Sequence, residues 1–231
     1  MTQQETTAFH AGLTAERVID AAVELTHEGH LYGWSIRDLA RRLGVAPSVI
    51  YHHVGGKDLL ARHVVERVVD TLEAPSADLE WDAWFREFLL SSQPVIVAMP
   101  GVAKWLILHG PTFPSVLPII DAGIGVLLRA GFGDRAALAY TLLLNAAILT
   151  ISVGDERLLH EDDGPRDHAA MMEEFHRATL GSPGLTALSE HLIQPFANGG
   201  DDAERQRDEY YRFVVETTIA GLAASLSPDG P

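Results

Sequence analysis

Apolar residues recur at helical spacing along most of the chain, and an alternating, strand-like pattern is almost absent. The pattern first predicts a helix over residues 14–28, with Thr14 as its N-cap and Gly29 at its end. A second, much shorter helix is predicted by one apolar stripe at positions i, i+3, i+4 and i+7, made of Ile36, Leu39, Ala40 and Leu43. The N-terminal part is therefore expected to be a compact helical unit.

The end of the short helix and the start of the next one are marked by local signals. Ser35 and Asp38 form a capping-box pattern, Gly44 stands where a C-cap glycine is expected, and Pro47 suits the first turn of a new helix. Two short helices joined by a glycine-containing turn of about three residues are typical of a helix-turn-helix. The sequence therefore predicts a DNA-binding motif.

The third helix has one apolar and one exposed face. If Ile50 and Val54 point inward, the outward positions at about 100° per residue are small or able to form hydrogen bonds: Ser48, Val49, Tyr51 and His52. Such groups can contact base edges or phosphates. Lys57 stands at the start of the following helix, predicted over residues 58–72, where a lysine and free backbone amides could hold a phosphate.

The remaining sequence is also helical in pattern. Helices are expected over residues 82–94, 100–109, 113–130, 134–154, 167–180 and 204–226. The predicted fold class is all-α, with an N-terminal helix-turn-helix domain and a helical ligand-binding and dimerisation domain. The expected organisation is an arm over residues 1–13, the DNA-binding domain with its connecting helix over 14–72, and the second domain over 73–231.

Composition and charge narrow the function. The chain has 231 residues and no cysteine, which excludes disulfides, thiolate zinc sites and cysteine nucleophiles and favours a cytoplasmic protein. The formal net charge is −15. Residues 1–72 hold only −2 of this, with seven basic and nine acidic side chains, and residues 33–57 carry +3. The excess of acidic side chains thus lies in residues 73–231, and the only basic island, residues 33–57, coincides with the predicted helix-turn-helix.

Membrane, metal and catalytic alternatives are weaker. Residues 136–153 are uncharged, but they contain several polar side chains and lack a basic flank, so a buried helix is preferred over a membrane span. Residues 160–163 could bind a hard cation, although a solvated acidic loop is the preferred interpretation. No serine lies in a strand–turn–helix nucleophile context, and no glycine-rich phosphate motif is present. We therefore expect no catalytic site, no cofactor and no metal.

The motif region resembles the DNA-binding domain of the tetracycline-repressor (TetR) family. The resemblance is carried by Leu39-Ala40, Leu43-Gly44-Val45, Tyr51-His52-His53, Lys57 and Leu59-Leu60, in one ungapped stretch. It implies that Arg37 reaches the major groove or a phosphate, that Ser48 and Val49 meet base edges, and that Lys57 clamps a phosphate. It further implies backbone or base contacts for Tyr51 and His53 and a specificity-determining place for His52. Gly55-Gly56 depart from the family, where many members carry a basic residue or asparagine, which implies one missing backbone contact.

The resemblance also implies a homodimer closed by two C-terminal helices from each subunit, and a palindromic double-stranded operator. The predicted helix at 134–154 is apolar nearly all round. The last helix places an apolar stripe beside small residues that allow close approach: Tyr211, Val214, Val215, Thr218 and Leu222. A largely apolar small-molecule effector is expected in the second domain. The candidates to contact it are aromatic or isolated polar residues on apolar faces: Trp84, Phe88, Trp105, His109, Phe113, Asn145 and Phe175.

The sequence thus predicts a repressor whose homodimer is released from its operator by a small molecule. Two alternatives stay open. The chain could activate transcription or work without a small-molecule inducer, or it could act through protein partners with the helix-turn-helix kept only as a scaffold. Ordinary core packing is the competing interpretation for each aromatic residue named as an effector contact.

Overall fold

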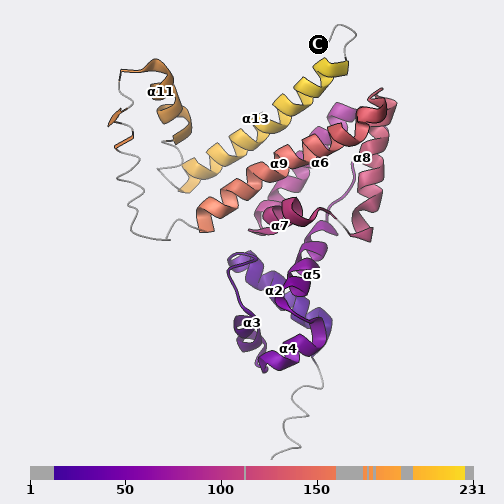
Figure 1. Ribbon diagram of the computed structural model, residues 1–231, viewed down its shortest axis with the longest axis vertical. Coiled ribbons are helices and arrows are strands. Elements are labelled where there is room, and N and C mark those ends of the chain that lie inside the picture. Colours follow the sequence, from indigo (N-terminus) through magenta and orange to yellow (C-terminus); the bar gives the residue numbers. More distant parts are fainter. Residues whose placement is uncertain are drawn as a thin grey trace, which may run out of the picture.

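The computed structural model describes residues 13–111, 113–159, 174–175, 177–178, 181–193 and 200–226. These residues form helices and no strand, which confirms the all-α class (Figure 1). The N-terminal unit contains α2 (Ala15–Glu28), α3 (Ile36–Leu43), α4 (Pro47–Val54) and α5 (Lys57–Val69). The predicted arm at residues 1–12 and the predicted acidic loop at 160–163 lie outside the described residues, as does most of the helix expected at 167–180.

The larger unit lies above the N-terminal one in Figure 1. Its elements are α6 (Trp81–Val97), α7 (Val102–His109), η1 (Pro114–Val116), α8 (Leu117–Arg129), η2 (Gly133–Arg135), α9 (Ala136–Leu159), α11 (Pro183–Leu188), the π-helical turn η3 (Ser189–Ile193) and α13 (Gly200–Leu226).

Several expected boundaries were wrong. The helix expected to end at residue 154 runs to Leu159, the helix expected from residue 204 begins at Gly200, and the helix expected to end at residue 72 ends at Val69. The helix expected to end at Pro94 continues to Val97, with Pro94 inside it. Pro94 is exposed, so the hydrogen bond that proline cannot donate is missing on the solvent-facing side of the helix.

The N-terminal unit has its own apolar centre. Val18 and Ala22 of α2, Leu39 of α3, Ile50 of α4 and Leu60 of α5 are each 0% exposed. The loop between α2 and α3 is fixed by a buried polar chain. The Trp34 indole N–H donates to the Thr26 hydroxyl at 3.0 Å, and that hydroxyl donates to the Ala22 carbonyl at 2.8 Å. The unit therefore holds α3 and α4 in one fixed arrangement on α2.

The larger unit is built around α9, which packs against α6, α7, α8 and α13. Its inward face places Leu143, Ala147 and Ile151 in the core. Three polar contacts join α13 to α6. Arg86 Nε lies 2.8 Å from Glu216 Oε1, the Gln93 amide donates to Asp208 Oδ1 at 2.8 Å, and the buried Tyr211 hydroxyl donates to the Leu89 carbonyl at 2.9 Å.

Helix α9 is apolar on its outward face too. Among the described residues, one helical stretch, Gly133–Glu156, is long and apolar enough to cross a membrane, with a mean hydropathy of 1.9; a third of that window is buried inside the chain. The outward leucines are largely exposed, Leu138 to 71% and Leu142 to 51%. Within one protomer, α9 is therefore buried only on its inward face and not on several sides as expected.

The two units meet at a tight polar junction. The Leu31 N–H, just after α2, donates to the Pro100 carbonyl at 2.8 Å. The Gly101 N–H donates to Oδ2 of the buried Asp155, near the end of α9, at 3.0 Å. A Cβ on Gly101 would lie 2.6 Å from Cε1 of the buried His30, so only glycine fits beside this ring. The junction thus joins the helix-turn-helix unit, the α6–α7 turn and α9.

Candidate nucleic-acid interface

Helix α3 begins and ends as its sequence predicts. The Ser35 hydroxyl accepts from the Asp38 N–H at 3.3 Å, and the Asp38 carboxylate accepts from the Ser35 N–H at 2.9 Å. The Ser35 hydroxyl also donates to the Asp38 carboxylate at 2.6 Å, and this hydrogen bond, together with those from the Ser35 N–H and from Arg41, lowers the pKa of Asp38. Gly44 ends the helix in the left-handed region, with φ +66°. The capping box and the C-cap glycine are both confirmed, and they make possible the sharp turn into α4.

Helix α4 presents the side chains that the pattern assigned to its outer face. Pro47 occupies its first turn, and Ile50 and Val54 are buried. Ser48 and His52 are exposed, Tyr51 is 54% exposed, and Val49 and His53 are half-buried. In Figure 1 α4 lies in the lower part of the molecule, far from α9 and α13. The polar face of α4 is thus free to enter a groove.

The basic island is smaller than its sequence suggests. Arg42 is turned back onto α2, where it pairs with Glu28 at 2.6 Å and Glu24 at 2.9 Å. Arg37 is exposed, and the Arg41 side chain is 76% exposed while it pairs with Asp38 at 3.0 Å. Of the three arginines, Arg37 and Arg41 point to solvent and Arg42 holds α3 on α2.

Lys57 is also engaged within the protein. Its ammonium group donates to the Trp34 carbonyl, lies 3.4 Å from the Tyr32 carbonyl, and stands 4.4 Å from the centre of the Trp34 ring. Burial lowers the pKa of this lysine. The lysine therefore ties the start of α5 to the α2–α3 loop. No sequence signal gave these partners, because they lie more than 20 positions away.

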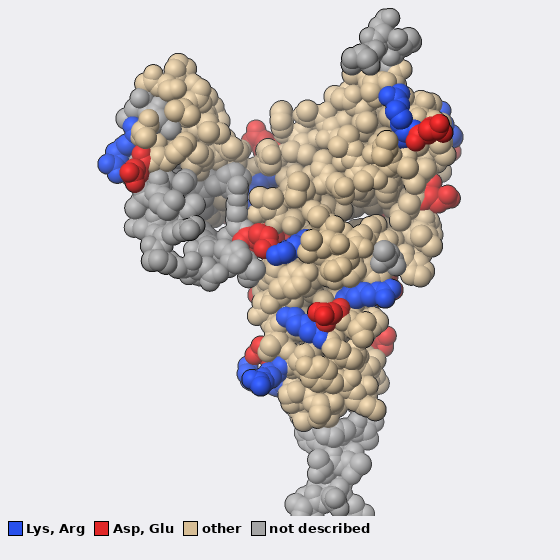
Figure 2. Space-filling model, viewed as in Figure 1, with Lys and Arg blue, Asp and Glu red and all other residues tan. Residues whose placement is uncertain are grey.

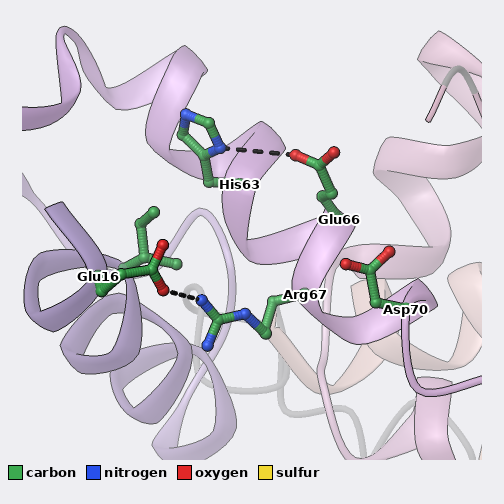
Figure 3. A pocket seen from close by; sticks show the side chains of 6 residues that line it. Glu16, His63, Glu66, Arg67 and Asp70 are labelled. Carbon is green, nitrogen blue, oxygen red and sulfur yellow. Dashed lines mark hydrogen bonds and ion pairs between the residues drawn. The ribbon is translucent and has the colours of Figure 1, made fainter. Parts of the chain in front are cut away.

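A polar hollow of about 170 Å³ lies between α2 and α5 (Figure 3). Within it, Arg67 pairs with Glu16 at 2.5 Å and with the neighbouring Asp20 at 2.8 Å, while His63 faces Glu66 at 3.6 Å. No group of three or more metal-ligating side chains occurs among the described residues. The charges of this hollow hold α5 against α2.

The seven effector candidates do not meet at one site. Trp84 and Phe88 of α6 stack with ring centres 5.3 Å apart in the core. Trp105 stacks on Phe113 at 5.4 Å, and the guanidinium carbon of Arg62 in α5 lies 5.7 Å from the Phe113 ring centre. The other three are exposed or half-buried: His109, Asn145 and Phe175. The aromatic candidates thus form two clusters, and the second touches the helix-turn-helix unit.

The Trp84 indole N–H has no hydrogen-bond acceptor among the described residues, although the side chain is 0% exposed. Its ring also lies 3.2 Å from where a Cβ on Gly123 would stand, so α8 can approach this closely only with glycine at that position. Tyr140 reaches the same glycine, and burial raises the pKa of its phenol to about 12. Buried indole N–H groups ordinarily have an acceptor. The Trp84 indole N–H is thus a donor without an acceptor among the described residues, in an apolar interior.

The outer surface of α9 and of the C-terminal half of α13 is broad and apolar. Figure 2 shows the upper body with few charged side chains over these helices. Phe213 is 65% exposed, and the same side of α13 carries the exposed small residues Thr217, Ala220 and Gly221. The stripe that the sequence assigned to self-association lies on the other side: Tyr211 and Val215 are buried within the protomer. The two faces differ by two residues in phase, which places them on nearly opposite sides of the helix.

Comparison with known proteins agrees with this geometry. The sequence model described as "Bacterial regulatory proteins, tetR family" matches residues 18–64, the span from α2 to α5. The chain is 27% identical over 197 residues to the class A tetracycline repressor protein from transposon 1721 of Escherichia coli, covering 83% of this chain and 84% of that one. The N-terminal unit is a TetR-family DNA-binding domain. The chain is a helix-turn-helix transcriptional regulator.

Other TetR-family relatives extend the comparison. The class D tetracycline repressor protein of Escherichia coli is 34% identical over 134 residues, 55% of this chain and 60% of that one. Apo ActR from Streptomyces coelicolor superposes with a TM-score of 0.69 at 23% identity, covering 94% of this chain and 100% of that one. The fold likeness therefore extends beyond the DNA-binding unit to the helices above it.

Proposed function

We propose that this TetR-family protein is a repressor whose homodimer binds a palindromic operator and leaves it when a small molecule binds the larger unit. The observation that carries the proposal is the free polar face of α4 at the end of the molecule, on a unit that matches the family's DNA-binding domain. Recognition helices of this kind enter the major groove, and a dimer places two of them about one helical turn apart.

The DNA contacts follow from the positions of the side chains. Ser48, Val49 and His52 meet base edges from the outer face of α4, and Tyr51 and His53 contact the backbone or a neighbouring base. Arg37 contacts a phosphate or the groove. We retain Lys57 as a phosphate contact made together with its bond to the Trp34 carbonyl, since an ammonium group has three donors.

The dimer forms through the outer faces of α9 and α13. Contiguous apolar surface on these neighbouring helices costs free energy while it faces water, and burying it stabilises association by about 25 cal/mol per Å². Small residues on α13 allow a partner helix to approach closely. A two-fold dimer matches the symmetry of a palindromic operator.

The effector is expected in the apolar interior between α6, α8 and α9. Trp84 would donate its free indole N–H to an acceptor atom of the effector, and the aromatic rings would cover its apolar part. The neighbour ActR has been solved in complex with actinorhodin and with (S)-DNPA. By analogy, the effector of this chain is proposed to be a mostly apolar molecule with a hydrogen-bond acceptor.

Effector and operator are coupled through the junction at Gly101. The Trp105–Phe113 stack touches Arg62 of α5, and His30 and Leu31 contact the α6–α7 turn, so a shift of α6 or α7 reorients the helix-turn-helix unit. Coupling of this kind is reciprocal: DNA must weaken effector binding by the same factor as effector weakens DNA binding.

The test is selection of random double-stranded DNA by the full chain, purified through unfolding and refolding so that no effector is retained. A two-fold symmetric consensus is expected. His52→Ala should change the consensus at one position of each half-site, whereas His63→Ala, in the hollow between α2 and α5, should leave it unchanged. No enrichment by a folded, dimeric protein would overturn the proposal and favour action through protein partners.

A further inference from the structure

Asn145 is placed at the centre of the exposed apolar stripe of α9. The stripe runs from Leu138 through Leu142 and Leu149 to Val153, with exposed fractions between 43% and 71%. Asn145 is exposed and makes no hydrogen bond with the described residues. At about 100° per residue, Leu138, Leu142 and Leu149 all lie within about 60° of Asn145 around the helix. The exposed Thr141 lies on the same side, but its hydroxyl already donates to the Ala137 carbonyl at 2.8 Å, so the Asn145 amide is the unpaired polar group of this stripe among the described residues.

The spacing is symmetric about this amide. Leu142 precedes it by three positions and Leu149 follows it by four, while Leu138 precedes it by seven and Val153 follows it by eight. In a two-fold dimer the same patch serves both subunits, so the centre of a fully buried patch lies on the two-fold axis. A stripe centred on residue 145 thus brings Asn145 next to its own copy.

The orientation of α9 agrees with a crossing at this point. A dimer that reads one DNA duplex has its two-fold axis running from the upper unit toward the DNA. Helix α9 crosses the upper part of the molecule obliquely instead of pointing at α4 (Figure 1). Two such helices related by this axis cross, and they touch most closely where the axis passes between them.

We propose that Asn145 fixes the register of the dimer, its carboxamide meeting the same carboxamide of a second copy across the two-fold axis. The inference rests on the dimer of the proposed function. A carboxamide is both donor and acceptor, so two of them satisfy each other. Any displaced pairing buries the amide against leucine and leaves its donors and acceptor unsatisfied, which disfavours that pairing. A single asparagine in an apolar helix seam is known to specify register in this way. This assignment competes with the effector contact expected for Asn145.

The absence of cysteine from the chain makes a sharp test possible. We would oxidise the full-length single variants Asn145→Cys, Leu138→Cys and Leu128→Cys. A disulfide needs Cα atoms within about 7 Å. Position 138 lies about 10 Å along the helix from position 145, and Leu128, on α8, is 54% exposed. Asn145→Cys should cross-link at least about tenfold faster than either control.

Asn145→Leu tests the register itself. Sedimentation should give a dimer dissociation constant equal to or lower than that of the parent, because leucine is apolar. Cross-linking of Leu138→Cys should rise at least about tenfold when Asn145→Leu is added, because displaced pairings no longer bury an amide. Thermal melts would confirm that each variant is folded.

The outcomes separate the two proposals. A parent chain that sediments as a monomer at micromolar concentration would remove the dimer and this inference together. A dimeric parent in which Asn145→Cys cross-links no faster than Leu128→Cys would keep the dimer and overturn the role of Asn145. Unchanged cross-linking of Leu138→Cys in the Asn145→Leu background would overturn the register function alone.

Discussion

Gly101→Ala is the substitution whose cost the structure defines best. Gly101 has φ +90°, in the region that disfavours residues with a Cβ, and the added methyl group would lie 2.6 Å from Cε1 and 2.9 Å from Nε2 of His30. The imidazole cannot easily move aside. It is 5% exposed, and its Nδ1 accepts from the Tyr32 N–H at 3.1 Å.

Two costs add at this position. The left-handed backbone costs about 1–2 kcal/mol for a residue with a Cβ, and forcing a methyl group into a packed site costs about 1–3 kcal/mol more. We therefore expect Gly101→Ala to lower the free energy of unfolding by about 2–5 kcal/mol. Gly131 is the matched control, because its φ is +94° and a Cβ there meets nothing within 4 Å. Gly131→Ala should lose only the backbone part.

The assay is urea unfolding of the four chains of a double-mutant cycle, with Gly131→Ala measured alongside. In a His30→Ala background the methyl group has room, so the cost of Gly101→Ala should fall to that of Gly131→Ala. Equal costs for Gly101→Ala and Gly131→Ala in the parent would refute the reasoning. A cost at Gly101 that persists after His30→Ala would show that the His30 ring is not its cause.

Three further outcomes are expected. Burial raises the pKa of Asp155 from 3.8 to about 6, so between these values the folded chain binds more protons than the unfolded chain and its stability falls as the pH rises from 4 to 6. Asp155→Asn keeps an acceptor for the Gly101 N–H, and this variant should be more stable than the parent by up to about 3 kcal/mol at pH 7 and equal to it near pH 4. Melting temperatures of parent and variant that run parallel from pH 4 to 7 would contradict this reasoning. Tyr211→Phe should cost about 1 kcal/mol in denaturant unfolding by removing the buried bond to Leu89, whereas Tyr210→Phe, at a 45% exposed neighbour, should cost almost nothing. Lys57→Met should lower the free energy of unfolding by about 1–2 kcal/mol, because the contacts of the ammonium group with the Trp34 carbonyl and ring are lost. It should also reduce the slope of log operator affinity against log salt concentration by about one, and an unchanged slope would remove Lys57 from the phosphate contacts.

Local signals explain why the helix-turn-helix could be predicted closely. The capping box at Ser35, the left-handed Gly44 and the first-turn Pro47 each act within a few residues, so the ends of α3 and α4 follow from neighbours in the sequence. The buried Ile50 and Val54 follow from helical spacing alone.

Features that depend on distant partners could not be predicted. In the sequence Arg42 is a free positive charge, whereas in the folded chain it pairs with Glu24 and Glu28 of α2. Helix α9 is apolar on every side, so its composition did not tell which leucines face the core and which face solvent. The same ambiguity led to the wrong side of α13, where Phe213 is exposed and Tyr211 is buried.

The engagement of Arg42 and Lys57 within the protein has a consequence for how this regulator finds its operator on a chromosome. Sliding along arbitrary DNA depends on phosphate contacts. Among the described cations of the motif, Arg42 is paired with glutamates and Lys57 shares its donors with the Trp34 carbonyl, while residues 73–231 carry most of a −15 net charge. Non-cognate complexes should therefore be brief, and the target should be reached mainly through repeated encounters from solution. The net negative charge of the upper unit also repels the negatively charged duplex, so most productive encounters begin with α4 nearest the DNA.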